Sequence, residues 1–590
     1  MRSPHIRRLT VAVTVATAAT FPATPALADA PAAGATATAS PVDAARAAAF
    51  AHASATGVTR GDTLQAKDVM TDPDGKQHVR FLRSHQGMPV LGGDLVVHLD
   101  RRGGYLGVTR AADHAVKPAT TAAKLTAEEA ERKAADAAQG EAGTAELVLD
   151  ARDGHAALAY QVRVTDSRTA EAGGSRTVVV DALTGRVRSD TPDNDEFISP
   201  RLGETLRKRG ESATPGTDGQ VALSGLTAAP ASAAAHYPST ANGTGTSLFV
   251  GKVPLTTTRT ARTSYLLKDP TRWGTETRDA KGRELEVFSR GTALTSTTDE
   301  WGNGATSNRA TVAVDAQYGI TKTLDFYKKT FGRKGIRNNS TGAHAMVHFG
   351  NKVGNAFWDS DCGCMLYGDG DGRLFKKPLV VLDVTGHELT HGVVDATAGL
   401  EPTRVDRYGQ YGEPGALNES LADIFGSGVE FAANNPKNPP NYLMGEKLGL
   451  RQKFLRRLDH PSLDKLEGTV DYWSPQVYDT EVHAGSGVSS HAFYLLAEGS
   501  GRKTIGGVAY ESPTYDGSKV TGIGRAKALA IFYRALTRYM VSTTDFHDAR
   551  TATLKAATDM YGASSTEYKT VDAAWAAVNV TDADAPSDGR

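Results

Sequence analysis

Residues 387–391 read His-Glu-Leu-Thr-His, a spacing suited to metal-assisted hydrolysis. Two histidines four positions apart lie on one face of a helix, so both imidazoles can bind one metal ion at about 2 Å. Glu388 follows the first histidine, and its carboxylate can take a proton from a metal-bound water. Because so short a pattern recurs by chance, a helix with two surface histidines and a solvated glutamate is the alternative interpretation.

A second run, residues 415–423, supplies a third ligand. Catalytic zinc takes three protein ligands and keeps one position open for water. On a helix, Glu419 and Asp423 lie one turn apart. Glu419 can be the third ligand, and Asp423 can accept a hydrogen bond from the far ring nitrogen of a ligating histidine. We therefore predict one catalytic zinc, bound by His387, His391 and Glu419.

The elements that position these residues occupy the last part of the 590-residue chain. Residues 241–400 carry strand and turn signals, among them the apolar runs 247–250 and 253–255. Residues 401–590 are mainly helical, with long amphipathic periodicity over 523–539 and 547–561. The pattern predicts an α+β fold with a β-rich N-terminal lobe, which includes the zinc helix, and a mainly helical C-terminal lobe.

The beginning of the chain resembles a secretory signal. Residues 1–28 combine a basic start, a short apolar run and the small-residue cleavage pattern Ala26-Leu27-Ala28. The apolar run is too short to span a bilayer of about 30 Å, and we find no later run of 18 or more apolar residues. We therefore expect a secreted protein without a membrane span.

Four further segments precede the main body. Residues 29–60 are a low-complexity segment rich in Ala, Thr and Pro, with little signal for order. Residues 61–120 contain two strand patterns, whereas 121–190 predict a small α+β module. Its helix opens at Thr126, with Glu129 closing a capping box. Residues 191–240 are rich in Pro, Gly, Ala and Ser, and we interpret them as a linker and processing region.

Composition excludes some partners and leaves one question open. Charged residues are 23% of the chain and the net charge is −1, which gives no reason to expect nucleic acid or an anionic membrane as a partner. Cys362 and Cys364 are the only cysteines, too few for a zinc site of their own. They form either a local disulfide or two free thiols.

The pattern H-E-L-T-H, followed by N-E-S-L-A-D at residues 418–423, resembles the thermolysin-like metallopeptidases. The similarity covers most of residues 245–580, including 355–358, 368–372 and 482–487. Residues 78–100 resemble the fungalysin/thermolysin-type propeptide module, and 125–188 resemble the PepSY module. The resemblance implies a two-lobed zincin peptidase, with the zinc helix in the cleft between the lobes. It also implies that the N-terminal modules act as chaperone and inhibitor until the enzyme cuts within about 190–240.

The resemblance further implies roles in catalysis. His483 would donate a hydrogen bond to the oxyanion, with Asp479 orienting it, although Asp479 lies one residue nearer than is usual in the family. Asn418 would support the histidine ligands, as Asp423 does. A tyrosine that usually follows T-A-G-L is replaced here by Glu401-Pro402 and an insertion. Tyr411 is the best substitute for it, and Tyr408 is the second.

Substrate contacts are implied in the same way. Asn355 and the backbone of Ala356 would hold the substrate as an extended strand. Phe357 and Trp358 would form the cleft wall, and Arg456 would bind a substrate carbonyl. The pocket for the residue after the cut bond favours bulky apolar side chains, because its lining is apolar: Phe375, Val384, Met444 and Leu455.

Calcium binding is the last implied feature. Asp383, Glu430 and Glu446 match calcium ligands of the family, and carboxylate oxygens suit this ion. Asn441 and Leu443 stand where acidic residues would support a paired site. We therefore expect one structural calcium.

Other interpretations remain for the residues and for the chain. His483 can be a buried, satisfied histidine, Arg456 a solvated cation beside Arg457, and Phe357 and Trp358 core residues. A serine hydrolase would need a G-x-S-x-G elbow, which we do not find. A non-catalytic zinc fold used for binding has no need for Glu388. We expect a monomeric zinc endopeptidase that acts on proteins and peptides.

Overall fold

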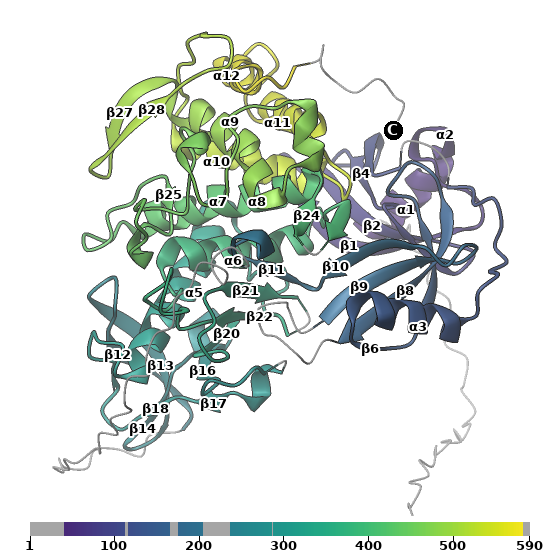
Figure 1. Cartoon of the computed structure of the whole chain (residues 1–590). Coiled ribbons are helices and arrows are strands. Elements are labelled where there is room, and N and C mark those ends of the chain that lie inside the picture. The colour runs from purple at the N-terminus through teal and green to yellow at the C-terminus, as the bar shows by residue number, and fades with distance from the viewer. Residues whose placement is uncertain are drawn as a thin grey trace, which may run out of the picture. The chain divides into compact units, whose positions relative to one another are not determined.

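The computed structural model describes residues 40–112, 116–165, 175–203, 237–285, 287–360, 362–406 and 408–581 (Figure 1). The predicted signal 1–28, the start of the low-complexity segment and most of the predicted linker lie outside the described residues. The chain divides into residues 1–40 and a compact unit of residues 41–590, to which the following description applies. Among the described helices, none has the length and apolar character needed to cross a membrane.

Residues 62–192 form a single ten-stranded sheet that joins the two N-terminal modules. Its order is β10-β9-β8-β7-β3-β2-β4-β5, while β1 pairs with β2 and β6 pairs with β8. The junction is a parallel pairing of β3 with β7, in which Val90 lies opposite Leu149. The strands are β1 Asp62–Thr71, β2 Gln77–His85, β3 Met88–Leu91, β4 Leu95–Leu99, β5 Tyr105–Arg110, β6 Glu141–Ala142, β7 Glu146–Asp150, β8 Ala157–Thr165, β9 Ser175–Asp181 and β10 Val187–Pro192.

Helices cover this sheet, and one of them corrects the expectation for residues 29–60. From Pro41 onward that segment is α1, Pro41–Ala51, followed by α2, Ala53–Thr56. Alanine has the highest helix propensity, and Ala45 and Ala49 lie one turn apart, fully buried in the core of the first module. Composition alone suggested little order, because a helix rich in small residues is stabilised mainly by packing against the rest of the module.

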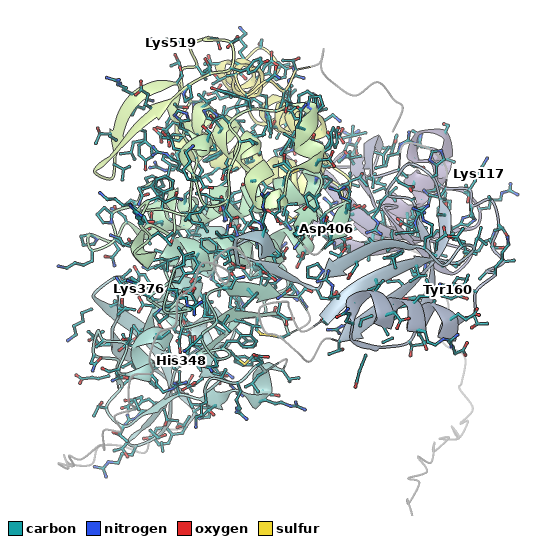
Figure 2. The ribbon with its side chains drawn as sticks, viewed as in Figure 1. Lys117, Tyr160, His348, Lys376, Asp406 and Lys519 are labelled. Atoms are coloured by element: carbon teal, nitrogen blue, oxygen red, sulfur yellow. A yellow bond between two sulfur atoms is a disulfide. The ribbon has the colours of Figure 1, made fainter. Side chains whose placement is uncertain are left out.

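The second module has the helix expected from its capping box. Helix α3, Ala127–Ala138, begins at the N-cap Thr126, whose side chain accepts from the N–H of Glu129, while the Glu129 side chain accepts from Thr126 N–H. This confirms the predicted start. Tyr160, labelled in Figure 2, ties β8 to the entry of α3, because its hydroxyl donates to Leu125 O at 3.1 Å.

The β-rich lobe contains a seven-stranded sheet of order β11-β21-β22-β20-β16-β15, with β17 paired to β16, and a five-stranded sheet of order β18-β14-β13-β12-β19. Helix α5, Arg309–Phe331, packs between strands of both sheets and α6. The strands are β11 Asn194–Glu196, β12 Ser239–Thr246, β13 Lys252–Ala261, β14 Ser264–Leu266, β15 Lys268–Asp269, β16 Thr275–Asp279, β17 Thr292–Ala293, β18 Thr295–Ser296, β19 Glu300–Trp301, β20 His344–Val347, β21 Ala356–Asp359 and β22 Cys364–Tyr367.

The apolar run 247–250, expected to be a strand, is a turn between β12 and β13. The Asp315 carboxylate, on α5, accepts from Leu248 N–H at 2.7 Å, and the Ser247 hydroxyl accepts from Val250 N–H at 2.7 Å. These side chains accept hydrogen bonds from backbone N–H groups that, in a strand, would be bonded to the neighbouring strand of the sheet. The expectation for 253–255 was correct, since these residues lie in β13.

The C-terminal lobe is helical, as expected, with short hairpins between the helices. The predicted helix over 523–539 is α10, which continues as a π-helical turn at Ala535–Tyr539. The helices from the metal-ligand run onward are α6 Leu382–Asp395, α7 Glu413–Ala433, α8 Val482–Gly485, α9 Gly487–Glu498, α10 Arg525–Arg534, α11 Phe546–Tyr561 and α12 Thr566–Ala576. The hairpins pair β23 Arg404–Asp406 with β24 Gly409–Tyr411, β25 Leu443–Met444 with β26 Arg456–Arg457, and β27 Gly501–Ile505 with β28 Val508–Ser512.

Two glycines bring the helices that carry the predicted ligands into close contact. A Cβ on Gly386 of α6 would lie 3.0 Å from the Cα of Gly426. A Cβ on Gly426 of α7 would lie 2.8 Å from the carbonyl oxygen of Asp383 and 3.0 Å from the nitrogen of His387. Only glycine permits this approach, which places the histidines of α6 against the carboxylates of α7.

The cysteines, whose state the sequence left open, form a disulfide between Cys362 and Cys364 at the start of β22.

Candidate active site

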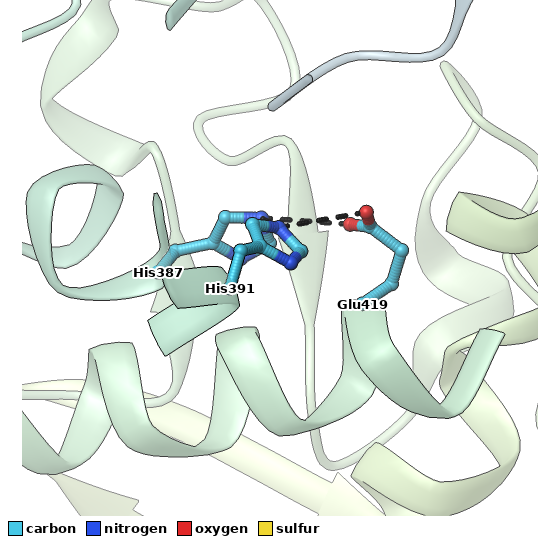
Figure 3. A group of neighbouring side chains, drawn as sticks. All are labelled: His387, His391 and Glu419. Carbon is cyan, nitrogen blue, oxygen red and sulfur yellow. Dashed lines mark hydrogen bonds and ion pairs between the residues drawn. The ribbon is translucent and has the colours of Figure 1, made fainter. Parts of the chain in front are cut away.

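The two histidines and Glu419 meet between α6 and α7 (Figure 3). The Nε2 atoms of His387 and His391 are 3.1 Å apart, and the Glu419 carboxylate lies 3.5 Å from the first and 3.6 Å from the second. All three side chains are buried, and together they form a group whose ligand atoms lie within 4.8 Å of one another. Burial of so many polar groups at one point needs a compensating charge.

The far ring nitrogens show that this group fits a metal ion. His387 Nδ1 lies 2.8 Å from Asp423 Oδ1, and His391 Nδ1 lies 3.0 Å from Asn418 Oδ1. The carboxylate oxygen of Asp423 and the amide oxygen of Asn418 are acceptors, so the Nδ1 atom of each histidine donates. In a neutral imidazole the Nε2 atom then carries a lone pair, and the two Nε2 lone pairs face each other. A cation bonded to both nitrogens at about 2 Å would resolve this repulsion. Two imidazoles and a carboxylate are a donor set suited to zinc.

Glu388 is the next residue on α6 and is fully buried. Among the described residues, no side chain donates a hydrogen bond to its carboxylate, and the backbone N–H of Trp358 faces it without forming a well-aligned bond. Burial, together with the charges of Glu419 and Asp195, raises the pKa of Glu388 well above its ordinary value. A raised pKa makes the carboxylate a stronger base, which suits a residue that takes a proton from water.

His483, at the start of α8, faces the same point. Its Nε2 lies 3.6 Å from Glu419 Oε2, and its Nδ1 lies 3.0 Å from Glu481 Oε2. Burial opposes a charged imidazole, but Glu419 and Glu481 outweigh it and raise the pKa of His483 well above its ordinary value. A protonated His483 can donate from Nε2 to an oxygen that gains negative charge.

The predicted role of Asp479 is corrected in favour of Glu481. Asp479 ends a short 3₁₀ turn, its side chain is 80% exposed, and it pairs with Arg404 at 3.3 Å. Glu481 instead caps α8, where its carboxylate accepts from the backbone N–H of His483 at 2.8 Å and so lies beside the imidazole. The sequence signal was the position of Glu481, two residues before His483 at a helix start.

The predicted oxyanion tyrosine is likewise directed elsewhere. The Tyr411 hydroxyl donates to Asp406 Oδ1 at 3.3 Å within its own hairpin, and the Arg404 guanidinium stacks on its ring at 4.3 Å. Asp406, labelled in Figure 2, is exposed. Tyr408, the second choice, is 42% exposed. The Tyr411 hydroxyl is therefore directed at Asp406 rather than at the zinc-ligand group, His387, His391 and Glu419, although the Tyr411 backbone forms a bridge with Glu481.

Arg456, on β26, is buried and holds two partners. Its guanidinium donates to both oxygens of Asp423, at 2.8 and 2.9 Å. Its Nη1 donates to the carbonyl oxygen of Phe197 at 3.0 Å. Arg456 thus connects the carboxylate that supports His387 to a peptide carbonyl in the cleft, and the alternative of a solvated cation is wrong.

Strand β21 and Asn355, the residue before it, carry the predicted substrate contacts. Asn355 Oδ1 accepts from Ile198 N–H at 3.2 Å, and Ala356 O accepts from Phe197 N–H at 3.1 Å. Phe357, by contrast, packs in a small separate core with Phe349, on the opposite side of the strand from Ala356 and Trp358. Only the backbone of Phe357 faces the cleft, so its ring is a core side chain.

The four residues expected to line the apolar pocket are fully buried in one core cluster with Phe197: Phe375, Val384, Met444 and Leu455. The Phe197 ring lies next to Gly445, which has no side chain to fill this space. A Cβ at Gly445 would lie 3.5 Å from Leu455 Cβ and 3.6 Å from Phe197 Cε1. The ring therefore occupies an apolar space beside β25.

The predicted calcium ligands also meet. Asp383, Glu430 and Glu446 form a buried or half-buried group with ligand atoms within 4.8 Å of one another. Burial and the like charge of Asp383 raise the pKa of Glu446 to about 8. Asn441 donates to both glutamates, at 3.4 and 3.0 Å. Three carboxylates held together away from water fit a hard divalent cation.

Sequence reasoning missed the segment that fills the cleft. Residues 194–199 were assigned to a linker, yet Asn194–Glu196 is strand β11 and Phe197 is fully buried. Asp195 lies 3.8 Å from His391 Nδ1, and burial and the charge of Glu419 raise its pKa to about 7. The apolar pair Phe197-Ile198 within a polar stretch was the available signal.

Family models match almost all of the described chain. The thermolysin metallopeptidase catalytic domain matches residues 242–395, and the alpha-helical domain of the same family matches 408–580. The Fungalysin/Thermolysin Propeptide Motif matches residues 62–112, and the peptidase propeptide and YPEB domain matches 124–191.

Individual proteins agree with these matches. The chain is 38% identical over 537 residues to a transglutaminase-activating metalloprotease of Streptomyces mobaraensis, covering 90% of this chain and 62% of that protein. It is 32% identical over 540 residues to the thermostable neutral protease NprT of Geobacillus stearothermophilus, covering 88% and 86%. It is 39% identical over 275 residues to a thermolysin of Alicyclobacillus acidocaldarius, covering 45% of each chain. A solved precursor of protealysin from Serratia proteamaculans is 28% identical, with a TM-score of 0.39, over 52% of this chain and 87% of that one.

Proposed function

Because the chain belongs to the thermolysin family of metallopeptidases, we propose that it is a secreted zinc endopeptidase made as a self-processed precursor. The main observation behind this proposal is that His387, His391 and Glu419 lie together, with Glu388 on the helix of the two histidines. A zinc fold used only for binding has no need of an uncompensated buried carboxylate at this position. The chain spans 62% of the first relative's length and 45% of the thermolysin's.

The site residues divide the work of peptide hydrolysis. His387, His391 and Glu419 would hold the zinc ion, which would supply Lewis acidity toward the scissile carbonyl and toward water. Glu388 accepts a proton from the attacking water and delivers it to the leaving amine. His483 donates from Nε2 to the carbonyl oxygen as charge develops, and Glu481 holds the imidazole in that orientation.

Removal of zinc provides the first test. We expect 1,10-phenanthroline to abolish hydrolysis of a blocked peptide with Leu or Phe after the cut bond, and added zinc to restore it. The purified enzyme should contain one zinc per chain, measured by atomic emission, and the His387→Ala variant should lose it. Calcium replenishment without zinc serves as the control and should restore nothing.

The outcomes of this test separate two functions. Full activity in a zinc-free protein would contradict the proposal. One bound zinc, correct processing and no hydrolysis of casein or any peptide would instead favour a metal-stabilised binding module.

The pocket beside Gly445 supports a preference for bulky apolar side chains after the cut bond. Its residues Val384, Met444 and Leu455 present apolar surface in a buried setting, with Phe375 in the same core cluster. Phe197 already occupies this space. Polar side chains would lose their hydration there without compensation.

One calcium ion at Asp383, Glu430 and Glu446 is a further part of the proposal. The group joins α6, α7 and the turn after β25, so a cation there would fix the zinc helix against its neighbours. Its role would be structural, because this group shares no residue with the group of His387, His391 and Glu419.

The N-terminal sheet supports a role as inhibitor and folding aid for the catalytic part. Asp72, just after β1, pairs with Arg534 and with Arg538. Arg80 donates to the carbonyl oxygen of Met540 at 2.7 Å. Asp94 accepts from the Ser542 hydroxyl at 2.5 Å. Buried, charge-assisted contacts of this kind hold two surfaces in one orientation.

Acid should weaken this interface through a buried histidine pair. His78 and His98 lie with their Nδ1 atoms 2.8 Å apart, and His78 Nε2 lies 3.0 Å from Asp72. Burial, followed by the charge of His78, lowers the pKa of His98 to about 3. The ionisable groups of the surrounding elements are Asp72, Arg80, Arg534, Arg538, Tyr539 and Lys555.

The direction of the pH effect on stability follows from the lowered pKa of His98. The folded chain keeps His98 neutral, whereas the same side chain in the unfolded chain binds a proton below about pH 6.5. The free energy of unfolding is therefore highest above that pH and falls as the pH decreases toward 3. Between pH 6.5 and 4.5 the free energy of unfolding should fall by about 2 kcal/mol. Thermal unfolding of the Glu388→Ala precursor should show it. His98→Gln should flatten the pH dependence, whereas the exposed His155→Gln control should not. Equal slopes for all three proteins would contradict the prediction.

A further inference from the structure

Residues 194–199 lie beside the zinc-ligand group, and the first three of them form the added strand β11. Strand β11 forms the edge of the seven-stranded sheet and pairs antiparallel with β21, so that Asn194 lies opposite Asp359 and Glu196 opposite Phe357. The strand places its residues next to α6 and the zinc-ligand group. Strand addition of this kind is how an extended peptide binds to a sheet edge.

Four contacts surround a single peptide bond of this strand, the one between Glu196 and Phe197. On one side of the bond, the carbonyl oxygen of Glu196 lies 2.7 Å from His483 Nε2. On the other, Phe197 N–H donates to Ala356 O at 3.1 Å, and Phe197 O accepts from Arg456 at 3.0 Å. One residue further, Ile198 N–H donates to Asn355 Oδ1 at 3.2 Å.

This pattern matches the roles proposed for the site. The carbonyl that faces His483 is the one on which negative charge would develop, and its carbon is where water would add. The carbonyl of the following residue is bound by Arg456, which donates from the fixed fork of its guanidinium. Any shift of the strand by one residue would turn these groups away, because neighbouring carbonyls of a strand point in opposite directions.

The side chain after the bond fits the apolar pocket. The Phe197 ring is fully buried, lies 5.3 Å from the His387 ring, and lies under the Arg456 guanidinium at 5.0 Å. On the far side it meets the space left by Gly445, whose φ of +71° and missing side chain keep that wall open. The residue at this position is therefore of the type that the pocket favours.

The strand is anchored beyond the pocket as well. The Glu467 carboxylate accepts from the backbone N–H and the hydroxyl of Ser199, at 3.1 and 2.5 Å. Before the bond, the Glu196 side chain accepts from Asn355 Nδ2 at 3.1 Å. Contacts on both sides fix the bond at the site rather than letting the segment slide.

We propose that the Glu196–Phe197 peptide bond is the first maturation cut, made by the chain's own active site. The inference rests on the proposed peptidase function. Water adds to the carbonyl carbon of Glu196, and the bond from that carbon to the nitrogen of Phe197 breaks. Glu388 transfers a proton from the water to that nitrogen. Glu196 gains the new carboxylate, and Phe197 becomes the new amino terminus.

A two-step maturation follows from this position. The catalytic-domain match begins at residue 242, so the first product still carries residues 197–241 ahead of it. A later cut would be needed to produce an enzyme that begins at the matched domain. The released N-terminal part would end in a carboxylate at Glu196, while the contacts of Asp72, Arg80 and Asp94 remain intact. The cut by itself therefore leaves the N-terminal sheet bound.

The test identifies the ends of the first fragments of the full chain. Samples taken early after secretion would be analysed by intact-mass spectrometry and N-terminal sequencing. We expect one fragment that ends at Glu196 and one that begins at Phe197, found together in the same gel-filtration peak. The Glu388→Ala precursor should contain neither.

Substitutions at Phe197 test the pocket. Phe197→Asp should slow the cut at this bond by roughly 10²-fold, because a carboxylate would be buried in apolar surroundings. Phe197→Leu is the matched control and should be cut nearly as fast as the wild type. If Phe197→Asp fails to fold, a synthetic peptide of residues 191–201 replaces it. Processed wild-type enzyme should cut this peptide between Glu196 and Phe197, and the Asp version roughly 10²-fold more slowly.

The results distinguish this inference from the proposed function. A first cut elsewhere in 198–241, made by an enzyme that digests casein in a zinc-dependent way, would overturn the inference alone. The same Phe197 terminus in the Glu388→Ala precursor would show that another protease makes the cut. A protein that neither binds zinc nor hydrolyses casein would overturn the proposed function itself.

Discussion

Replacing Glu388 by alanine is expected to lower kcat/KM on a blocked peptide by roughly 10³-fold, within the range of general-base catalysis. The carboxylate is fully buried next to the zinc-ligand histidines, and burial and the charges of Glu419 and Asp195 raise its pKa. Removing it deletes the group that takes the proton from water. It also relieves burial of a charge, so the fold should be retained or stabilised.

The measurement combines initial rates with two readouts of the unprocessed chain. Zinc content should stay at one per chain, because His387, His391 and Glu419 are unchanged. The secreted protein should accumulate as the uncut precursor. The control is Glu300→Ala, an exposed glutamate on β19, which should process and turn over as the wild type does. More than a tenth of the wild-type rate in Glu388→Ala would contradict the assigned role.

Replacing His483 by alanine is expected to lower kcat/KM by roughly 10²- to 10³-fold, the range seen when one oxyanion donor is removed. His483 Nε2 lies 2.7 Å from the carbonyl oxygen of Glu196, the group at which charge develops. Because the hydrogen bond strengthens in the transition state, the loss should fall on kcat with little change in KM.

The two acidic residues before His483 provide a matched pair. Glu481→Gln should lower kcat and shift the pH profile, because Glu481 holds Nδ1 at 3.0 Å and supports the charged imidazole. Asp479→Asn should leave the rate unchanged, because Asp479 is exposed and pairs with Arg404. The reverse order of effects would restore the sequence-based assignment to Asp479. A large rise in KM for His483→Ala would indicate a role in binding rather than in the transition state.

Much of the site depended on local geometry and was therefore predictable. A spacing of four places His387 and His391 on one face of any helix, and the same rule puts Glu419 one turn before Asp423. The start of α3 was equally local, since a capping box needs only residues 126–129. The fold class also followed from periodicity, because strand and helix patterns differ in their repeat and occupy different parts of the chain.

Long-range contacts explain the failures. Residues 247–250 have the composition of a strand, but Asp315, on a helix far along the chain, binds their backbone donors. In residues 41–51 the fully buried side chains are alanines, Ala45 and Ala49, and the helix packs them against the sheet. Tyr411 was chosen by proximity in the chain, whereas the hairpin β23–β24 directs its hydroxyl to Asp406.

The sequence by itself determined which residues we propose as metal ligands and as the base, and also the order of the modules, because each depends on residue type and on spacing within one element. Only the tertiary structure decided which carboxylate supports His483, how the two N-terminal modules join through β3 and β7, and which peptide bond lies at the site. These outcomes depend on segments far apart in the chain. The Glu196–Phe197 bond is placed by Asn355, Arg456 and His483 together, and no pattern within residues 191–240 encodes that meeting.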